Sequence, residues 1–85
     1  MTLAEQIREF ASSQHIKPAR KTSAPYSTLV KIVSGDLVKE MRLKDRTPAV
    51  CGALDAKKFQ DEYEIELLQR TGPKHGTTTT WTFLV

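Results

Sequence analysis

The side chains of this 85-residue chain that could bind a ligand are mostly cations, and they are unevenly spread along the sequence. Between Lys17 and Arg46 there are eight lysines and arginines against three acidic residues, whereas the stretch from Asp61 to Glu66 is strongly acidic. Clustered lysines and arginines attract phosphate groups, and segregated charge gives a small protein a positive and a negative side. This pattern favours binding of an anion over catalysis.

Nucleophiles and metal ligands form no recognisable catalytic pattern. The single cysteine, Cys51, follows Val50 in a stretch with helical periodicity and is expected to be a packed side chain. A lone cysteine also excludes a disulfide within the chain. His15 and His75 have no partners at metal-binding spacing, and the four glycines form no phosphate-cradling motif. We therefore expect no enzymatic activity, no metal site and no cofactor.

Length and composition predict a single domain that spans residues 1–85, because a chain of this size has room for one modest core. No apolar run approaches the roughly 20 residues that cross a bilayer. The first five residues lack the basic-then-apolar pattern of a signal peptide. We expect a cytoplasmic protein without membrane contact.

Capping residues and periodicity predict the elements of the first third of the chain. Thr2 and Glu5 form a capping-box pattern, so a helix should begin at Leu3. It should end between residues 13 and 16, because Pro18 cannot continue a regular helix. Residues 17–25 are then expected to form a basic loop. The β-branched stretch Tyr26–Val33 predicts a strand.

Two further helices are expected in the middle of the chain. Ser34 is the predicted cap of the first, which should end near Met41. After a basic turn at residues 42–46, Thr47 is the predicted cap of the second, with Pro48 at its first position. The apolar stripe of this second helix changes phase near Asp55. Either the helix kinks there or Asp55 caps a separate short helix, and the break is the preferred interpretation.

The chain ends in a predicted β-hairpin. Tyr63, Ile65 and Leu67 alternate with glutamates, which is typical of a half-buried strand. The threonine run at residues 77–80 favours β structure. Trp81 and Phe83 alternate with polar residues in the second strand, and this alternation favours a core position over a role in stacking on nucleic-acid bases.

The order of these elements, and two segments within it, resemble the winged helix-turn-helix family. The segment Gly35–Leu43 looks like the second helix and turn of many bacterial winged-helix proteins, and Thr47–Leu54 looks like the start of their recognition helix. The hairpin Ile65–Leu84 is similar to the wing, with its tip at residues 71–76. Two positions depart from the family pattern: Arg42 replaces a common glycine, and Phe59 follows Leu54 by five positions instead of about three.

The resemblance implies an α+β fold with a small antiparallel sheet. The implied order is helix, strand, helix, recognition helix, a short helix or kink, strand, wing and strand.

The resemblance also implies which residues meet nucleic acid. Arg42, Lys44, Arg46 and Thr47 would contact phosphates at the start of the recognition helix, where free amides and the helix dipole attract anions. Arg46 is also the best candidate for a guanine contact. Gly52, on a face of small residues, would permit close approach to a groove. The remaining implied contacts lie in the basic loop, at the far end of the recognition helix and in the wing: Lys17, Arg20, Lys21, Lys57, Lys58, Arg70, Lys74 and His75.

The leading hypothesis is a non-enzymatic module that binds double-stranded DNA. It would belong with small prokaryotic or phage transcriptional regulators or DNA-binding accessory proteins, with a homodimer on a two-fold site as one arrangement. Roughly six phosphate contacts would give a slope of log K against log salt near −5. The alternative is a protein–protein interaction module or inhibitor on the same scaffold, with a partner at the acidic strip Asp61–Glu66. For each cation, a merely solvated surface is the competing explanation.

Overall fold

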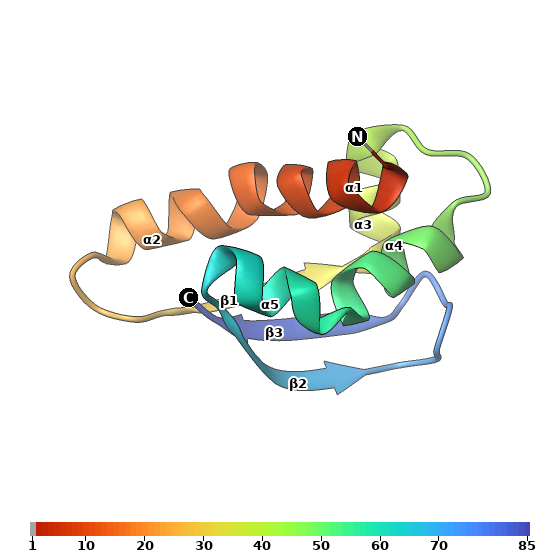
Figure 1. Ribbon diagram of the computed structural model, residues 1–85. Coiled ribbons are helices and arrows are strands. Elements are labelled where there is room, and N and C mark those ends of the chain that lie inside the picture. Colours follow the sequence, from red (N-terminus) through yellow and green to blue (C-terminus); the bar gives the residue numbers. More distant parts are fainter. Residues whose placement is uncertain (1) are drawn as a thin grey trace.

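The computed structural model describes residues 2–85 (Figure 1) and has an α+β fold. The helices and strands follow one another as α1 (Leu3–Ala11), η1 (Ser12–Ile16), α2 (Lys17–Ser23), β1 (Leu29–Val33), α3 (Ser34–Met41), α4 (Thr47–Asp55), α5 (Lys57–Tyr63), β2 (Glu66–Thr71) and β3 (Thr80–Leu84).

The predicted capping box starts the first helix. The backbone N–H of Glu5 donates to Thr2 Oγ1 at 3.2 Å, and the Glu5 carboxylate accepts the Thr2 backbone N–H at 3.4 Å. Two amides that the first helical turn leaves unpaired are thereby satisfied. The hydrogen bond from the Thr2 hydroxyl lowers the pKa of Glu5 below its ordinary value.

The first helix does not end before Pro18, so the predicted basic loop at residues 17–25 is wrong. α1, η1 and α2 are consecutive, and the middle segment η1 is a turn of π-helix in which the Lys17 N–H donates to Ser12 O. In a regular α-helix the proline ring clashes with the carbonyl four residues earlier and removes one hydrogen bond. The wider π turn absorbs this irregularity, and Pro18 falls in the first turn of α2. Lys17, Arg20 and Lys21 consequently lie on a helix.

The three strands form an antiparallel sheet in the order β1-β3-β2. The first strand begins at Leu29, three residues later than predicted. The second begins at Glu66, because Tyr63 still belongs to α5 and Glu64 ends that helix in a left-handed conformation with φ 55°. The Ile65 N–H then donates to Gln60 O, and the Leu67 N–H donates to the Gln60 side chain. The strand that the alternation from Tyr63 to Leu67 predicted is therefore present only from Glu66 onward, and the bonds to α5 keep residues 63–65 out of it.

The two middle helices are present, but neither predicted cap is correct. Ser34 is the first residue of α3, and its buried hydroxyl donates to Gly76 O instead of to its own helix. Thr47 is the first residue of α4, whose N-cap is Arg46 without a side-chain hydrogen bond. Helix α3 ends at Arg42 in a left-handed conformation with φ 56°, the geometry that makes glycine common at such positions.

The predicted break in the second of these helices is confirmed. Helix α4 ends at Asp55, Ala56 has an extended backbone with ψ 132°, and α5 begins at Lys57. The break lets α5 turn Phe59 into the core, where its ring contacts Tyr63 and Phe83 edge-on at centroid distances of 5.5 and 5.3 Å. Asp55 does not cap α5, because no side chain does so.

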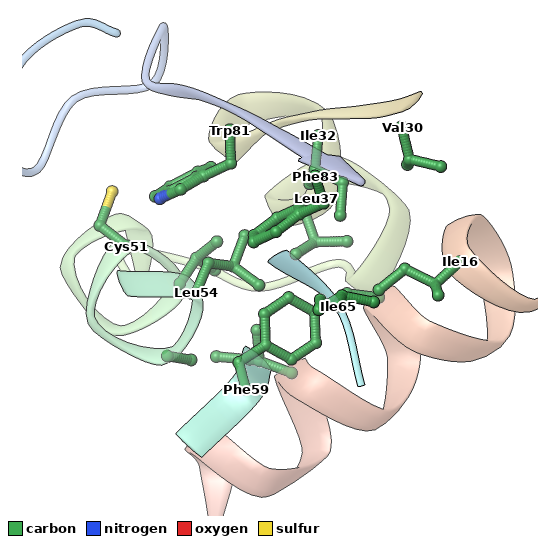
Figure 2. Close-up of a cluster of buried hydrophobic side chains, with 14 residues drawn as sticks. Ile16, Val30, Ile32, Leu37, Cys51, Leu54, Phe59, Ile65, Trp81 and Phe83 are labelled. Carbon is green, nitrogen blue, oxygen red and sulfur yellow. The ribbon is translucent and has the colours of Figure 1, made fainter. Parts of the chain in front are cut away.

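The helices lie on one side of the sheet, and within the described chain no element covers its other face (Figure 1). The core fills the space between the two layers. Figure 2 shows Phe83 and Leu37 in the middle of the core, with Trp81 and Phe59 on opposite sides of them and Leu54 nearby, all fully buried. The predicted core positions of Trp81 and Phe83 are therefore confirmed, and neither ring is available to stack on a base.

Candidate nucleic-acid interface

The amino-terminal end of α4 offers unpaired amides. No side chain caps this helix, and its first turn contains no acidic residue. Pro48 has no N–H and the Val50 N–H donates to Arg46 O, whereas the amides of Thr47 and Ala49 have no acceptor among residues 2–85. Such amides, together with the positive end of the helix dipole, attract anions. This end of α4 can therefore bind a phosphate or a carboxylate.

Exposed cations surround this helix end. Arg42, Lys44 and Arg46 lie in the loop between α3 and α4, all exposed and none in an ion pair with another described residue. One exposed acid, Asp45, lies among them with φ 55°. The local charge of this α3–α4 loop is positive.

The loop of the β2–β3 hairpin is bonded to the start of α3 and contacts the second turn of α4. The Ser34 N–H donates to Thr79 O and the Gly35 N–H donates to Thr77 O, both at 2.9 Å. The Cys51 Sγ lies 3.8 Å from Gly76 O. Gly35 has no room for a side chain, because a Cβ would lie 2.7 Å from Thr77 O. These contacts fix the hairpin loop beside the second turn of α4.

The hairpin loop brings two more of the predicted contacts to this end of the molecule. Lys74 and His75 are exposed, two residues and one residue before Gly76. The α3–α4 loop and the hairpin loop lie at the same end of the molecule (Figure 1). The structure thus brings together six of the predicted residues: Arg42, Lys44, Arg46, Thr47, Lys74 and His75.

The outward face of α4 is small and nearly free of hydrogen-bonding groups. Pro48, Gly52 and Asp55 are exposed at positions i, i+4 and i+7, and Ala49 and Ala56 are half-buried beside them. A Cβ at Gly52 would meet nothing within 4 Å. A flat partner can therefore come close to this face, but apart from the Asp55 carboxylate its exposed side chains offer no group that could read a base edge.

Arg70, predicted as a nucleic-acid contact, is not a free wing cation. Its Nε and Nη2 donate to the two carboxylate oxygens of Asp55 at 2.6 and 3.0 Å, and Nη2 also donates to Lys74 O at 2.9 Å. Its guanidinium carbon lies 5.6 Å from the centroid of the Trp81 ring. The side chain holds the hairpin loop against α4 and is only about a quarter exposed, at 25%.

Asp55 is the partner that joins these groups. Besides Arg70 it accepts the Trp81 Nε1–H at 2.7 Å. Burial alone would raise its pKa, but the hydrogen bonds from Arg70 and Trp81 hold the pKa of Asp55 below its ordinary value. The bonds to Asp55 likewise raise the pKa of Arg70. Sequence reasoning missed this role, because the three residues lie on α4, β2 and β3 and no local pattern connects them.

Arg20, another predicted contact, is also engaged within the protein. Its Nη2 donates to Tyr63 O at 2.7 Å and to Glu64 O at 2.6 Å, so it caps the carboxyl end of α5. Lys17 and Lys21 are exposed on the same helix, α2, which lies at the end of the molecule opposite the hairpin loop (Figure 1). These three residues do not belong to the candidate interface.

The remaining predicted cations lie at the start of α5. Lys57 and Lys58 are exposed there, beyond the carboxyl end of α4. The charge of Lys58 contributes to the lowered pKa of Glu5 in the first helix. The acidic strip Asp61–Glu66 is divided between α5, a turn and β2, with its four acidic side chains exposed.

Of the residues weighed for catalysis or metal binding, Cys51 is buried and His15 is engaged, whereas His75 is exposed in the hairpin loop. Burial raises the pKa of the Cys51 thiol, whose side chain is inaccessible. His15 Nε2 lies 3.2 Å from Glu40 Oε1. Among residues 2–85 no group of three or more His, Cys, Asp or Glu side chains could hold a metal ion.

Comparison of this chain with protein-family models, with curated proteins and with solved structures found no match. Within the described residues, no helix has both the length and the apolar character needed to cross a membrane.

Proposed function

We propose that this chain is a winged-helix module that binds duplex DNA mainly through the sugar–phosphate backbone. The strand order β1-β3-β2, with α3 and α4 between β1 and β2 in the chain, is compatible with that fold. The observation that carries the proposal is the uncapped start of α4 within a group of exposed, unpaired cations of the described chain.

Phosphate contacts explain this arrangement better than base reading does. The free amides of Thr47 and Ala49 suit one phosphate, and Arg42, Lys44 and Arg46 supply three cations in the adjoining loop. Lys74, in the hairpin loop at the same end of the molecule, supplies a fourth cation for a further phosphate. With about four neutralised phosphates the slope of log K against log salt should be near −3.6. This value is smaller than the sequence-based expectation, because Arg70 and Arg20 are engaged and the lysines of α2 lie elsewhere.

Sequence discrimination should be low. The exposed stripe of α4 consists of Pro48, Gly52 and Asp55, none of which donates a hydrogen bond from its side chain. Arg46, at the N-cap position, is the cation next to this helix with the fork geometry that pairs with guanine. We therefore propose a DNA-binding accessory role for this module ahead of recognition of a long specific site.

The test is fluorescence anisotropy with labelled duplexes of about 20 base pairs, of mixed and of uniform sequence, at about 50 and 200 mM salt. The double variant Lys44→Glu/Arg46→Glu should bind DNA much more weakly than the unmodified protein. Its remaining binding should have about half of the salt slope. The matched control Lys17→Glu/Lys21→Glu has the same change of charge at the opposite end of the molecule. It should retain affinity within about threefold.

Two results would contradict this proposal. Equal losses in both double variants would show that only net charge matters. No salt-dependent binding by the unmodified protein would remove the DNA-binding function. In that case the exposed acids of Asp61–Glu66 would make a protein-interaction module the better hypothesis.

A further inference from the structure

The uncovered face of the sheet contains a short apolar row on β1 and β3. The register places Leu29 of β1 opposite Leu84 of β3, and Glu66 of β2 on the other side of Leu84. Leu68 lies at the β-bulge between Leu67 and Gln69 of β2, without a paired residue on β3. Leu29 is 59% exposed and Leu68 is 50% exposed. Exposed apolar side chains on a sheet face that no other element covers favour a contact surface over a purely solvated one.

Opposite charges lie at diagonal corners of the same face. Lys31 of β1 is opposite Thr82, one outward position along the strand from Leu29, whereas Glu66 lies beside Leu84 on the far strand. By strand spacing and rise, their Cα atoms are about 12 Å apart. Both residues are exposed, and neither forms an ion pair with another described residue.

This arrangement is complementary to itself. Consider a two-fold axis in the plane between two facing copies that passes over β3 between Thr82 and Leu84. Rotation about this axis would exchange the corner at Lys31 with the corner at Glu66. Lys31 of each copy would then face Glu66 of the other, across the roughly 10 Å that separates packed sheets, with the leucine rows between them. We propose that this sheet face is the contact surface between two copies of this chain.

The size of the face predicts a weak dimer. Three strands at about 4.8 Å spacing and five residues at about 3.3 Å rise give a face of about 14 by 17 Å. The area of this face is well below the roughly 800 Å² per partner of a standard stable interface. The Kd of the dimer should therefore be in the micromolar range or above. The apolar row lies at the end of β3 away from the hairpin loop. Dimerisation thus leaves the start of α4 free, and this inference does not rest on the proposed function.

Charge exchange between the two corners tests the inference. The unmodified protein should show monomer–dimer equilibrium by sedimentation at about 10 to 500 µM. Lys31→Glu and Glu66→Lys should each weaken it at least about tenfold, because each change places two like charges in contact twice per dimer. The double variant Lys31→Glu/Glu66→Lys should restore the dimer. The control Lys39→Glu changes an exposed charge on α3 and should leave it unchanged.

Mixing the two single variants gives the most selective result. Each alone should be monomeric, whereas an equimolar mixture should form a heterodimer, since both corners of the Lys31→Glu copy are then acidic and both corners of the Glu66→Lys copy are basic. Circular dichroism should show that every variant is folded, and Lys31→Thr with Glu66→Thr provides a neutral pair if a charge reversal unfolds the chain. A monomeric unmodified protein at about 500 µM would overturn the inference. So would a dimer that the single variants leave intact, or a mixture that stays monomeric.

Discussion

Replacing Asp55 by alanine should destabilise the whole domain, although Asp55 lies on the surface of α4. Its carboxylate accepts one hydrogen bond from the buried Trp81 indole and two from Arg70. Through these bonds it joins the end of α4 to both strands of the hairpin and, through Arg70, to the hairpin loop. The substitution removes all three bonds at once without creating a cavity in the core.

The magnitude follows from the burial of each partner. Trp81 is 0% exposed, so its N–H would be left unpaired inside the protein at a cost of about 2 kcal/mol. The side chains of Arg70 and Asp55 are 25% and 33% exposed, so solvent screening limits the contribution of this ion pair to about 1 kcal/mol. The sum is about 3 kcal/mol, which corresponds to a decrease of about 12 to 24 °C in Tm for a domain of this size.

Thermal and urea denaturation, followed by circular dichroism and by the fluorescence of the single tryptophan, measure this effect. Asp55→Asn should lower the free energy of unfolding by less, about 1 kcal/mol. Its amide oxygen can still accept the Trp81 N–H, whereas the charge pair with Arg70 is lost. The control Asp61→Ala removes an exposed acid of α5 without a partner among the described residues and should stay within about 0.5 kcal/mol.

The pH dependence has a definite sign. Because the folded-state pKa of Asp55 lies below its ordinary value of 3.8, its contribution is fully present above that range and is lost as pH falls through the folded pKa. Asp55→Asn should therefore flatten the loss of stability below about pH 4. The reasoning would be refuted if Asp55→Ala were as stable as Asp61→Ala, or if alanine and asparagine had equal effects.

Four further changes have defined outcomes. Gly52→Ala should raise stability by about 0.5 to 1 kcal/mol in urea denaturation, because the helical site has open space for a methyl group, and a loss would contradict that geometry. Arg42→Gly should raise stability by about 0.5 to 1 kcal/mol by relieving the left-handed φ of 56°, and in anisotropy titrations it should reduce the DNA salt slope by about 0.9. Phe59→Ala should cost about 3 to 5 kcal/mol by emptying a fully buried site, and a cost below about 1 kcal/mol in denaturation would show that the site is loosely packed. The Cys51 thiol should react with a disulfide reagent at least about 100-fold more slowly in the folded protein than in urea, and equal rates would show that the hairpin loop does not cover it.

Short-range signals in the sequence were sufficient for much of the fold. The capping box of Thr2 and Glu5, the break after Asp55 and the inward positions of Trp81 and Phe83 are all as predicted. Each depends on residues within a few positions of one another, through a local hydrogen bond or a helical or strand period. The predicted group of Arg42, Lys44 and Arg46 lies within one exposed loop for the same reason.

Errors occurred where a local signal competed with a distant or unusual partner. Pro18 correctly indicates an irregularity, but the π turn of η1 accommodates it without ending the helix. Serine is a common helix N-cap residue, yet the Ser34 hydroxyl donates to the carbonyl oxygen of Gly76, which is far away in the sequence. Tyr63 continues the alternation of a strand, yet it also belongs to the helical stripe that begins at Phe59, and packing against the core selected the helix.

The sequence alone determined where most helices and strands lie, the face that each buries and the segregation of its charges, because these properties depend on neighbouring residues. Only the tertiary structure decided which cations remain available. It paired Arg70 with Asp55 and Arg20 with the end of α5, and it joined the hairpin loop at Lys74, through Arg70, to Asp55 at the end of α4. The physical reason is that a hydrogen-bonding partner is chosen by distance in space, and that distance is set by the register of the sheet and the packing of the helices against it.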